Sequence, residues 1–392
     1  MEPKKVKDGI FWVGAVDWDR RLFDSLIPLP DGTSYNAYLV KGGEKTALID
    51  TVDPSKTEVL LSQLAGVDRI DYIVSQHSEQ DHSGSIPHVL ERYREAVVVT
   101  SPKGKEYLVD LLHIPGERVV TIADGETLLL GNKTLEFLHT PWVHWPETFT
   151  TYLREDKVLF TCDLLGSHLA SSTLCMDEHW KVCEAAKRYY AEVMMPFRTS
   201  IRKHMERFSR YDVEIIAPSH GPVHDHVDCI IESHMGWISD RVSNTVVIPY
   251  ASMHGSTERM VDHLTEGLIQ RGVKVERFNL AHADTGKLAM ALVDAATIVV
   301  ASPTVLTGAH PLVISAAFLA NALRPKLKFA SIIGSYGWGG KMVEQIASTI
   351  SNLKVEMIEP VMVKGCPREE DFKRLDGLAA KIEERHSASN IV

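Results

Sequence analysis

The stretch QHSEQDHSGS, residues 76–85, places two histidines and two carboxylates within six residues: His77, Glu79, Asp81 and His82. It follows a β-branched run, RIDYIV, that predicts a buried strand ending in a loop. Alternate residues of an extended loop point the same way, so we expect His77, Glu79 and Asp81 to face one side and His82 to approach from the other. One ion does not readily accept all four side chains, and the spacing favours two adjacent metal ions.

Three later segments each end a predicted strand on a side chain of a type that binds metals. They are TPWVHWPET with His144, VLFTCDLLG with Asp163 and VEIIAPSHGP with His220. A metal site on the rim of a β-rich scaffold needs ligands at several strand ends. The first stretch alone also fits a solvated polar loop before a helix, and the recurrence of ligand types favours the metal site.

The chain has 392 residues, which predicts two domains. From residue 244 onward, β-branched runs alternate with helical patterns, as in an α/β doubly wound parallel sheet of five strands. The predicted strands are 245–250, 274–280, 297–302, 327–334 and 355–365. The earlier part has shorter strand-like runs between turns and a few helices, which predicts an α+β, layered and β-rich domain. We therefore predict domains at residues 1–243 and 244–392.

The net charge of −10 is unevenly distributed. Residues 244–392 hold 16 Lys/Arg and 15 Asp/Glu, which leaves 26 and 37 for residues 1–243. An acidic surface disfavours nucleic acid and anionic membranes as partners. No run of about 18 apolar residues could span a membrane, the N-terminus has no secretory pattern, and the five cysteines form no CxxC pair. These features predict a cytoplasmic protein.

Three loops follow predicted strands of the C-terminal domain, at the strand ends where doubly wound sheets bind ligands. The segment YASMHGSTERM opens a helix, and its backbone N–H groups and hydroxyls suit a phosphate. It lacks the GxxxxGK[ST] spacing of nucleotide triphosphatases. The segments SPTVLTGAHP and GSYGWGG carry glycines that allow close backbone approach, and the second also has aromatic side chains that can cover a flat ring.

The first of these loops resembles the phosphate loop of flavodoxins, so FMN is the predicted ligand. The candidate FMN-binding residues are Ser252, Met253, His254, Gly255, Ser256, Thr257, Ser302, Pro303, Thr304, Val305, Leu306, Thr307, Gly308, Ser335, Tyr336, Gly337, Trp338 and Gly339. The sequence has no GxGxxG fingerprint, which disfavours a dinucleotide.

The candidate metal ligands are similar to those of the metallo-β-lactamase superfamily, whose fold is an αββα sandwich. The first motif of that superfamily normally reads H-x-H-x-D-H, and here Glu79 replaces the middle histidine. An added oxygen donor shifts metal preference from zinc toward iron or manganese. With a flavodoxin-like domain downstream, nearly the whole chain resembles a flavodiiron protein, also called an A-type flavoprotein.

This resemblance implies two iron ions and seven ligands. One iron would be bound by His77, Glu79 and His144, the other by Asp81, His82 and His220, with Asp163 bridging them. It implies reduction of dioxygen to water, or of nitric oxide to nitrous oxide, with electrons delivered through FMN. It also implies a head-to-tail homodimer or a dimer of dimers, with rubredoxin or a reduced deazaflavin coenzyme as electron donor.

Three further residues are expected near the metals but not as ligands. His168 lies five residues after Asp163 and is a candidate hydrogen-bond donor to the open face of the metals. Tyr190 is a second candidate donor, or alternatively a core residue of an amphipathic helix. Glu147 stands where the family usually has aspartate, and we expect it to tune the site without binding metal.

Two other functions remain open at this point. One is a zinc-dependent hydrolase of the glyoxalase II or lactamase type fused to a flavodoxin domain, which Glu79 disfavours. The other is a flavodoxin-type electron carrier with a structural β-rich domain, which the complete ligand set disfavours. The metal content of the protein distinguishes these alternatives from the di-iron oxidoreductase.

Overall fold

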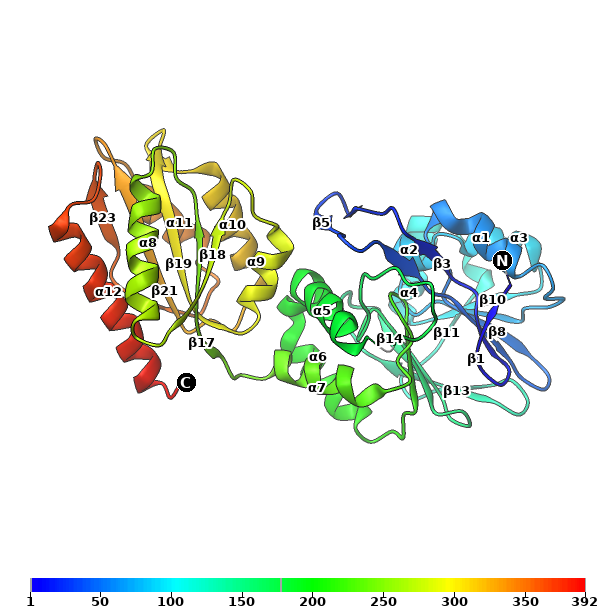
Figure 1. The fold of residues 1–392 in the computed structure, drawn as a ribbon. Helices are drawn as coiled ribbons and strands as arrows, with labels where there is room; N and C mark the ends of the chain where they lie inside the picture. The colour runs from blue at the N-terminus through cyan, green and yellow to red at the C-terminus, as the bar shows by residue number, and fades with distance from the viewer. Residues whose placement is uncertain (1, 177, 392) are drawn as a thin grey trace. The chain divides into compact units, whose positions relative to one another are not determined.

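The computed structural model describes residues 2–176 and 178–391 (Figure 1). The chain forms two compact units, which are described separately. The first is Met1–Tyr190 with Phe197–Ile238, and the second is Ala191–Pro196 with Ser239–Val392. The predicted domain boundary, between residues 243 and 244, falls at the start of strand β17 (Ser243–Tyr250).

The first unit contains two sheets. The seven-stranded sheet has the order β1 (Lys4–Lys7), β2 (Ile10–Trp12), β7 (Tyr38–Lys41), β8 (Thr46–Ile49), β9 (Tyr72–Val74), β10 (Val97–Thr100) and β11 (Val119–Thr121). The five-stranded sheet has the order β12 (Thr127–Leu129), β13 (Thr134–His139), β14 (Phe149–Leu153), β15 (Val158–Cys162) and β16 (Ile215–Pro218). Both sheets mix parallel and antiparallel pairs.

Alternating side chains of the seven-stranded sheet enter two different cores, as the two-residue period of a strand requires. Val40 and Ile49 pack with Phe137 and Phe160 of the other sheet. Leu39 and its outward-facing neighbours pack against the helices α1 (Thr57–Gln63), α3 (Ile86–Arg92) and α4 (Pro102–Leu112). Helices α5 (His179–Tyr189), α6 (Arg198–Phe208) and α7 (Val227–Ile238) complete the unit (Figure 1). The predicted αββα sandwich is confirmed.

Two short hairpins of this unit lie outside the main sheets. Strand β3 (Ala15–Asp17) pairs with β6 (Thr33–Tyr35), and β4 (Leu22–Phe23) pairs with β5 (Ile27–Pro28). Both are antiparallel. They matter for the site because the Phe23 ring lies 5.2 Å from the His168 ring and the Thr33 hydroxyl bonds to that histidine.

The second unit is a parallel sheet in the order β18 (Lys274–Asn279), β17, β19 (Ala295–Val305), β21 (Phe329–Tyr336) and β22 (Glu356–Met357). One face packs against α8 (Ser256–Ile269) and α12 (Glu369–Ala388). The other packs against α9 (Thr285–Leu292), α10 (Pro311–Leu323) and α11 (Met342–Thr349). This is the predicted doubly wound, flavodoxin-like architecture.

Two details of this sheet differ from the prediction. Strand β19 continues to Val305 and turns back as β20 (Gly308–Ala309), so part of the expected loop is a hairpin. The predicted strand at 355–365 is two pieces, β22 and β23 (Val361–Lys364), which both pair with β21. Pro360 lies between them, and its missing N–H interrupts the hydrogen-bond ladder.

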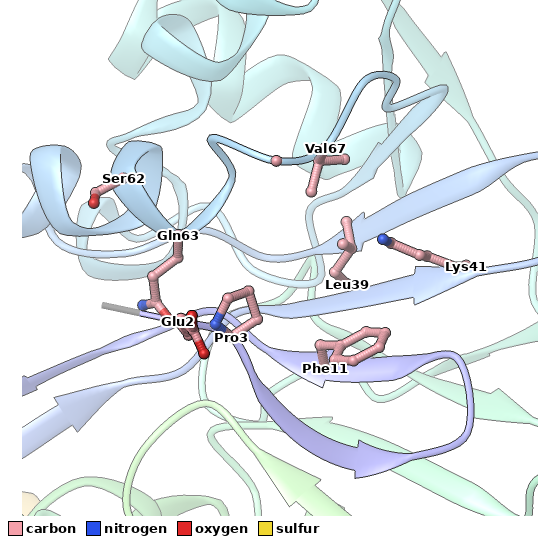
Figure 2. A pocket seen from close by; sticks show the side chains of 9 residues that line it. Glu2, Pro3, Phe11, Leu39, Lys41, Ser62, Gln63 and Val67 are labelled. Carbon is pink, nitrogen blue, oxygen red and sulfur yellow. The ribbon is translucent and has the colours of Figure 1, made fainter.

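A cavity of about 420 Å³ lies on the helix-covered side of the seven-stranded sheet, between Leu39 of β7 and Gln63 of α1 (Figure 2). Glu2 and Lys41 also line it, so its wall is partly charged. It contains none of the predicted site residues. Among the described residues, no helix has the length and apolar character needed to cross a membrane.

Candidate metal centre and cofactor pocket

The candidate metal ligands converge at the ends of strands in the first unit. His77 follows β9, Asp163 follows β15 and His220 follows β16. His144 lies in the loop between β13 and β14. Five of the seven side chains are almost fully buried, and those of Glu79 and His144 are 14% and 16% exposed.

The extended loop predicted for residues 77–82 is wrong in its second half. Gln80–Ser83 forms a short helix, α2, with Glu79 at its N-cap. The N–H of Ser83 donates to the Glu79 carbonyl at 2.9 Å, and the Ser83 hydroxyl donates to the same oxygen at 2.9 Å. Because a helical turn replaces the alternation of a strand, Asp81 lies against His82 and His220 instead of beside His77 and Glu79.

The first group of ligand atoms surrounds Glu79. Its Oε2 lies 3.1 Å from His77 Nε2 and 3.1 Å from His144 Nε2. Asp163 completes the group, with its Oδ2 at 3.6 Å from His77 Nε2 and 3.5 Å from His144 Nε2. Two nitrogens and two carboxylate oxygens therefore face a common point.

The second group lies on the other side of Asp163. The Nε2 atom of His82 is 3.3 Å from Asp81 Oδ1, and that of His220 is 3.1 Å from Asp81 Oδ2. The remaining oxygen of Asp163, Oδ1, lies 3.0 Å from His82 Nε2 and 3.4 Å from His220 Nε2. Asp163 thus directs one oxygen to each group, which is the geometry of a bridging carboxylate.

The polar atoms of this centre fit two cations. Both carboxylate oxygens of Asp81 and of Asp163 are buried without a hydrogen-bond partner, as is His82 Nε2. A buried charge without a partner is costly, and buried carboxylates are normally paired or bound to metal. The seven side chains carry three carboxylates and four imidazoles, so two divalent ions would satisfy these atoms and outweigh the negative charge.

The ionisation of the groups follows from their mutual contacts. Burial opposes protonation of His220, but the neighbouring carboxylates of Asp163 and Asp81 outweigh burial and raise its pKa to about 10. Burial likewise disfavours the charged form of Glu79, but hydrogen bonds from His144 and His77 bring its pKa well below the usual range. Glu79 and Asp163 are therefore ionised at neutral pH, and His77 and His220 hold protons that a metal ion would displace.

Two neighbours orient the ligand histidines. His77 Nδ1 donates to Glu147 Oε1 at 2.8 Å, and the Ser78 N–H donates to the same oxygen at 3.1 Å. His220 Nδ1 donates to the carbonyl oxygen of Ser34 at 2.8 Å. With Nδ1 engaged, each ring presents Nε2 to the centre, as metal-binding histidines commonly do.

The two candidate donors occupy different surroundings. His168 is buried with its ring centroid 4.8 Å from that of His220. Tyr190 instead directs its hydroxyl to the Trp237 carbonyl at 3.5 Å and packs on the Trp237 ring. Tyr189 is the tyrosine at the centre, with its ring 4.6 Å from that of His168. Because successive helical residues point about 100° apart, only one of two adjacent tyrosines can face the metal ligands. The sequence pattern alone did not show which of the two it is.

The His168 ring is held in a buried, polar environment. Burial lowers its pKa well below the usual value, and the neighbouring His220 adds to the effect. The Thr33 hydroxyl donates to the Ser34 carbonyl at 3.3 Å and lies 2.8 Å from His168 Nδ1. The other ring nitrogen of His168, Nε2, is buried without a hydrogen-bond partner. The donor role of His168 toward the metals therefore stays a prediction.

Sequence reasoning missed two acidic residues near the centre. Asp50 is buried, accepts from the Gln76 N–H at 2.8 Å, and has ligand-type atoms of His82 and Cys162 within 4.8 Å. Asp24 has a pKa raised by burial and by the charges of Glu79 and Asp81. Asp50 directly follows β8, just as Asp163 directly follows β15. This shared position after a strand is the sequence signal that could have identified Asp50.

In the second unit, the three predicted loops line one cavity of about 290 Å³. Its lining residues are Ser252, Met253, His254, Ser256, Thr257, Pro303, Thr304, Ser335, Tyr336, Gly337, Trp338 and Gly365. Thr257 and Ser335 join two of the loops through a hydroxyl contact of 3.0 Å. The Trp338 side chain is 92% exposed, which leaves its ring available to a ligand.

The remaining candidates of this pocket do not line the cavity. They are Gly255, Ser302, Val305, Leu306, Thr307, Gly308 and Gly339. Ser302 is buried and uses its hydroxyl to hold the backbone of Pro303 and His310. Gly255 precedes α8 with a φ of 83°, a conformation that favours glycine. Gly365, which the sequence analysis did not include, follows β23 and brings a fourth loop to the cavity.

Family models match both halves of the chain. One described as an ODP family beta lactamase matches residues 33–221, and one described as Flavodoxin matches residues 248–375. These ranges contain all the candidate metal ligands and all the candidate FMN-binding residues, respectively.

Several known proteins are similar to nearly the whole chain. A nitric oxide reductase of Moorella thermoacetica is 34% identical, covering 98% of this chain and 99% of the relative. The structure of rubredoxin oxygen:oxidoreductase from Desulfovibrio gigas is 31% identical with a TM-score of 0.95, covering 100% of both chains. The structure of the flavodiiron protein from Giardia intestinalis is 28% identical with a TM-score of 0.91, covering 99% and 97%.

Proposed function

Because the chain belongs to the flavodiiron protein family, we propose that it is an oxidoreductase that reduces dioxygen, nitric oxide or both at a di-iron centre with electrons delivered through FMN. The observation that carries this proposal is the geometry of Asp163, whose two oxygens face two separate groups of ligands. The proteins to which the chain is similar include a nitric oxide reductase and a rubredoxin-dependent oxygen reductase.

The residues that would hold the irons are those of the two groups. His77, Glu79 and His144 would bind one ion, while Asp81, His82 and His220 would bind the other, with Asp163 shared. When bound, the irons and FMN together supply the redox chemistry that no side chain of this chain can provide. Glu79 adds an oxygen donor to the first group, which favours iron over zinc.

The chain's own contribution around the metals is to orient ligands and to limit water. Glu147 holds His77 with Nε2 directed inward. Phe23 and Tyr189 place rings against His168 and His220, so aromatic side chains cover part of the second group. The Thr33 hydroxyl holds the His168 ring through Nδ1 at 2.8 Å, and we propose that His168 Nε2 donates a hydrogen bond to the open face of the metals.

In the second unit, the loop before α8 would bind the FMN phosphate. The N-terminus of a helix offers free N–H groups and a partial positive charge, and Ser256 and Thr257 begin this helix. Trp338 and Tyr336, which line the same cavity, would cover the flavin ring.

We further propose a head-to-tail homodimer in which the flavin of one subunit serves the metals of the other. The ligand groups and the cavity of the second unit belong to separate units of the chain, and electron transfer requires two cofactors to be close. Rubredoxin is the proposed electron donor, on the basis of the similarity to the Desulfovibrio gigas protein, and a reduced deazaflavin coenzyme is the alternative.

Metal analysis followed by single-turnover oxidation tests the function. We expect two irons and one FMN per chain, and rapid reoxidation of the anaerobically reduced flavin by dioxygen, nitric oxide or both. Zinc in place of iron would favour the hydrolase alternative, and no metal would favour the electron carrier. If iron is present and neither gas reoxidises the flavin, the proposed reaction is wrong.

A further inference from the structure

Two free cysteines of the first unit lie in contact with one another. Cys183 on α5 and Cys229 on α7 have sulfurs 3.1 Å apart, closer than two unbonded sulfur atoms normally approach. Both side chains are half-buried, so a small solute can reach them. Neither residue belongs to the metal centre or the cofactor pocket.

The surroundings of the pair give the two sulfurs different roles. The Ser233 hydroxyl donates to Cys183 Sγ at 3.6 Å, and Cys229 Sγ lies 3.1 Å from the same sulfur. The hydrogen bond with Cys183 and burial raise the pKa of Cys229 to about 11, so Cys229 retains its proton. Cys183 is the sulfur that also accepts a hydrogen bond from Ser233, so we assign the first reaction to it and the second to Cys229.

We propose that Cys183 and Cys229 are an oxidant-responsive dithiol that forms a reversible disulfide with hydrogen peroxide. The Cys183 thiolate attacks one peroxide oxygen, the O–O bond breaks, and the departing hydroxide takes a proton to become water. Cys229 then attacks the resulting sulfenic acid, the S–O bond breaks, and the proton of Cys229 leaves with that oxygen as a second water. The two sulfurs lose two electrons in total and the peroxide gains them.

The position of the pair connects it to the metal centre. The disulfide would tie α5 to α7, and α5 ends at Tyr189, six residues after Cys183. The Tyr189 ring lies 4.6 Å from that of His168 and 5.8 Å from that of His220. Oxidation of the dithiol therefore restrains the helix that places an aromatic ring against the metal ligands.

Thiol counting on the metal- and FMN-loaded protein tests the proposal. After treatment with hydrogen peroxide and removal of the excess, we expect two thiols fewer than in the untreated protein, and full recovery with dithiothreitol. A non-reducing digest should contain a peptide in which Cys183 is joined to Cys229. An unchanged thiol count, a loss that dithiothreitol does not reverse, or a disulfide between other cysteines would overturn the proposal.

Serine variants separate the two roles. Cys229→Ser should stop at a sulfenic acid on Cys183, detected as a dimedone adduct, whereas Cys183→Ser should give neither the adduct nor the disulfide. The matched control is Cys366→Ser, which removes the exposed thiol beside Arg259 and should leave the Cys183–Cys229 disulfide unchanged. Equal labelling of Cys229 in the Cys183→Ser variant would contradict the assigned order.

A structural zinc ion bound by the two thiolates is the alternative explanation for two cysteines in contact. The experiment separates the two cases. If the thiols of the untreated protein react only after a zinc chelator is added, and zinc is released with them, the site is structural and the dithiol proposal fails.

Discussion

At the scale of single residues, the most informative side chain is Glu79. One of its oxygens lies at the same distance, 3.1 Å, from the Nε2 atoms of His77 and His144. A histidine at this position would offer a nitrogen donor and no charge. The glutamate therefore makes the first group more anionic and harder, which suits an ion that changes its oxidation state.

Glu79→Ala and Glu79→His test this role together. We expect Glu79→His to exchange iron for zinc at the first group and to lower gas reduction at least 100-fold, while FMN remains bound, because an imidazole removes the oxygen donor and the charge. Metal analysis and flavin absorbance of the purified variant give the result. Glu79→Ala, which removes the ligand altogether, is the control for loss of metal without replacement. Iron occupancy and activity equal to the parent protein in Glu79→His would show that the ligand type does not select the metal.

The seven candidate ligands were available from the sequence because residue type and spacing are local properties. Among the residues around them, Glu147 was also recognised from the sequence, whereas Asp50, Asp24 and Tyr189 were not. Asp50 and Asp24 reach the centre from a different strand and a different hairpin, and only the fold brings them near His82 and Glu79. Tyr189 could not be separated from Tyr190 because the orientation of the helix depends on its packing against Trp237 and His234.

At the scale of elements, the site depends on turns that follow strands. The turn after β16 is one example, in which Gly221 directly follows the ligand His220. Gly221 has a φ of 79°, its N–H donates to the Ser34 hydroxyl at 2.8 Å, and its carbonyl accepts from the Asn36 amide at 2.8 Å. These bonds fix the backbone beside the ligand.

Gly221→Ala should damage both stability and metal binding. A Cβ atom there would lie 2.2 Å from Ser167 Oγ and 2.6 Å from the Ser167 carbonyl oxygen, and the φ is unfavourable for alanine. We expect a loss of about 2 kcal/mol or more in unfolding free energy, and lower iron occupancy because His220 moves. Denaturant unfolding and metal analysis measure both effects. Gly66→Ala, at a position where the added carbon meets nothing within 4 Å, is the matched control and should change stability by about 0.5 kcal/mol or less.

Helix α7 makes the stability of the first unit depend on pH. Burial lowers the pKa of His234 to about 3, and its Nδ1 donates to the Ile230 carbonyl at 3.0 Å. In the unfolded chain the histidine takes up a proton below about pH 6.5, whereas in the folded protein it remains neutral until about pH 3. The unfolded state therefore binds more protons in this window, and the free energy of unfolding falls as the pH is lowered.

His234→Asn should remove this contribution. Between pH 6.5 and 5, we expect the unfolding free energy of the variant to fall less steeply than that of the parent protein, by about 1 kcal/mol per pH unit. The variant and the parent protein have the same metal ligands. The difference between their slopes of unfolding free energy against pH is therefore the contribution of His234. The same substitution at His88, whose side chain is 54% exposed, serves as the control and should keep the parental slope. Equal slopes for the His234 variant and the parent would contradict the assignment.

At the scale of the whole molecule, the two domains and the class of cofactor that each would bind could be predicted from the sequence. Details of the sheets could not. Alternating strands and helices predicted the doubly wound sheet because parallel strands need crossover helices. The hairpin of β19 and β20 and the break at Pro360 depend on pairing partners distant in sequence. Gly365 joins the cofactor pocket for the same reason, since only the pairing of β23 with β21 brings its loop there.

The proposed homodimer makes a prediction that concerns the complete assembly. If the flavin of one subunit serves the metals of the other, a dimer can combine the working parts of two defective chains. Glu79→Ala removes a ligand of the first metal and leaves the second unit unchanged. Ser256→Glu places a carboxylate at the start of α8, where it repels the FMN phosphate, and leaves the metal ligands unchanged.

Each variant alone should be inactive, because every site in its homodimer lacks either a complete metal centre or a flavin. A mixed dimer, purified with two different tags after coexpression, contains one site in which both partners are intact. We therefore expect about half the activity of the parent dimer, since one of its two symmetry-related sites works. If the flavin served the metals of its own subunit, both sites of the mixed dimer would remain defective. Activity of the mixed dimer no higher than that of the two homodimers would exclude the head-to-tail arrangement.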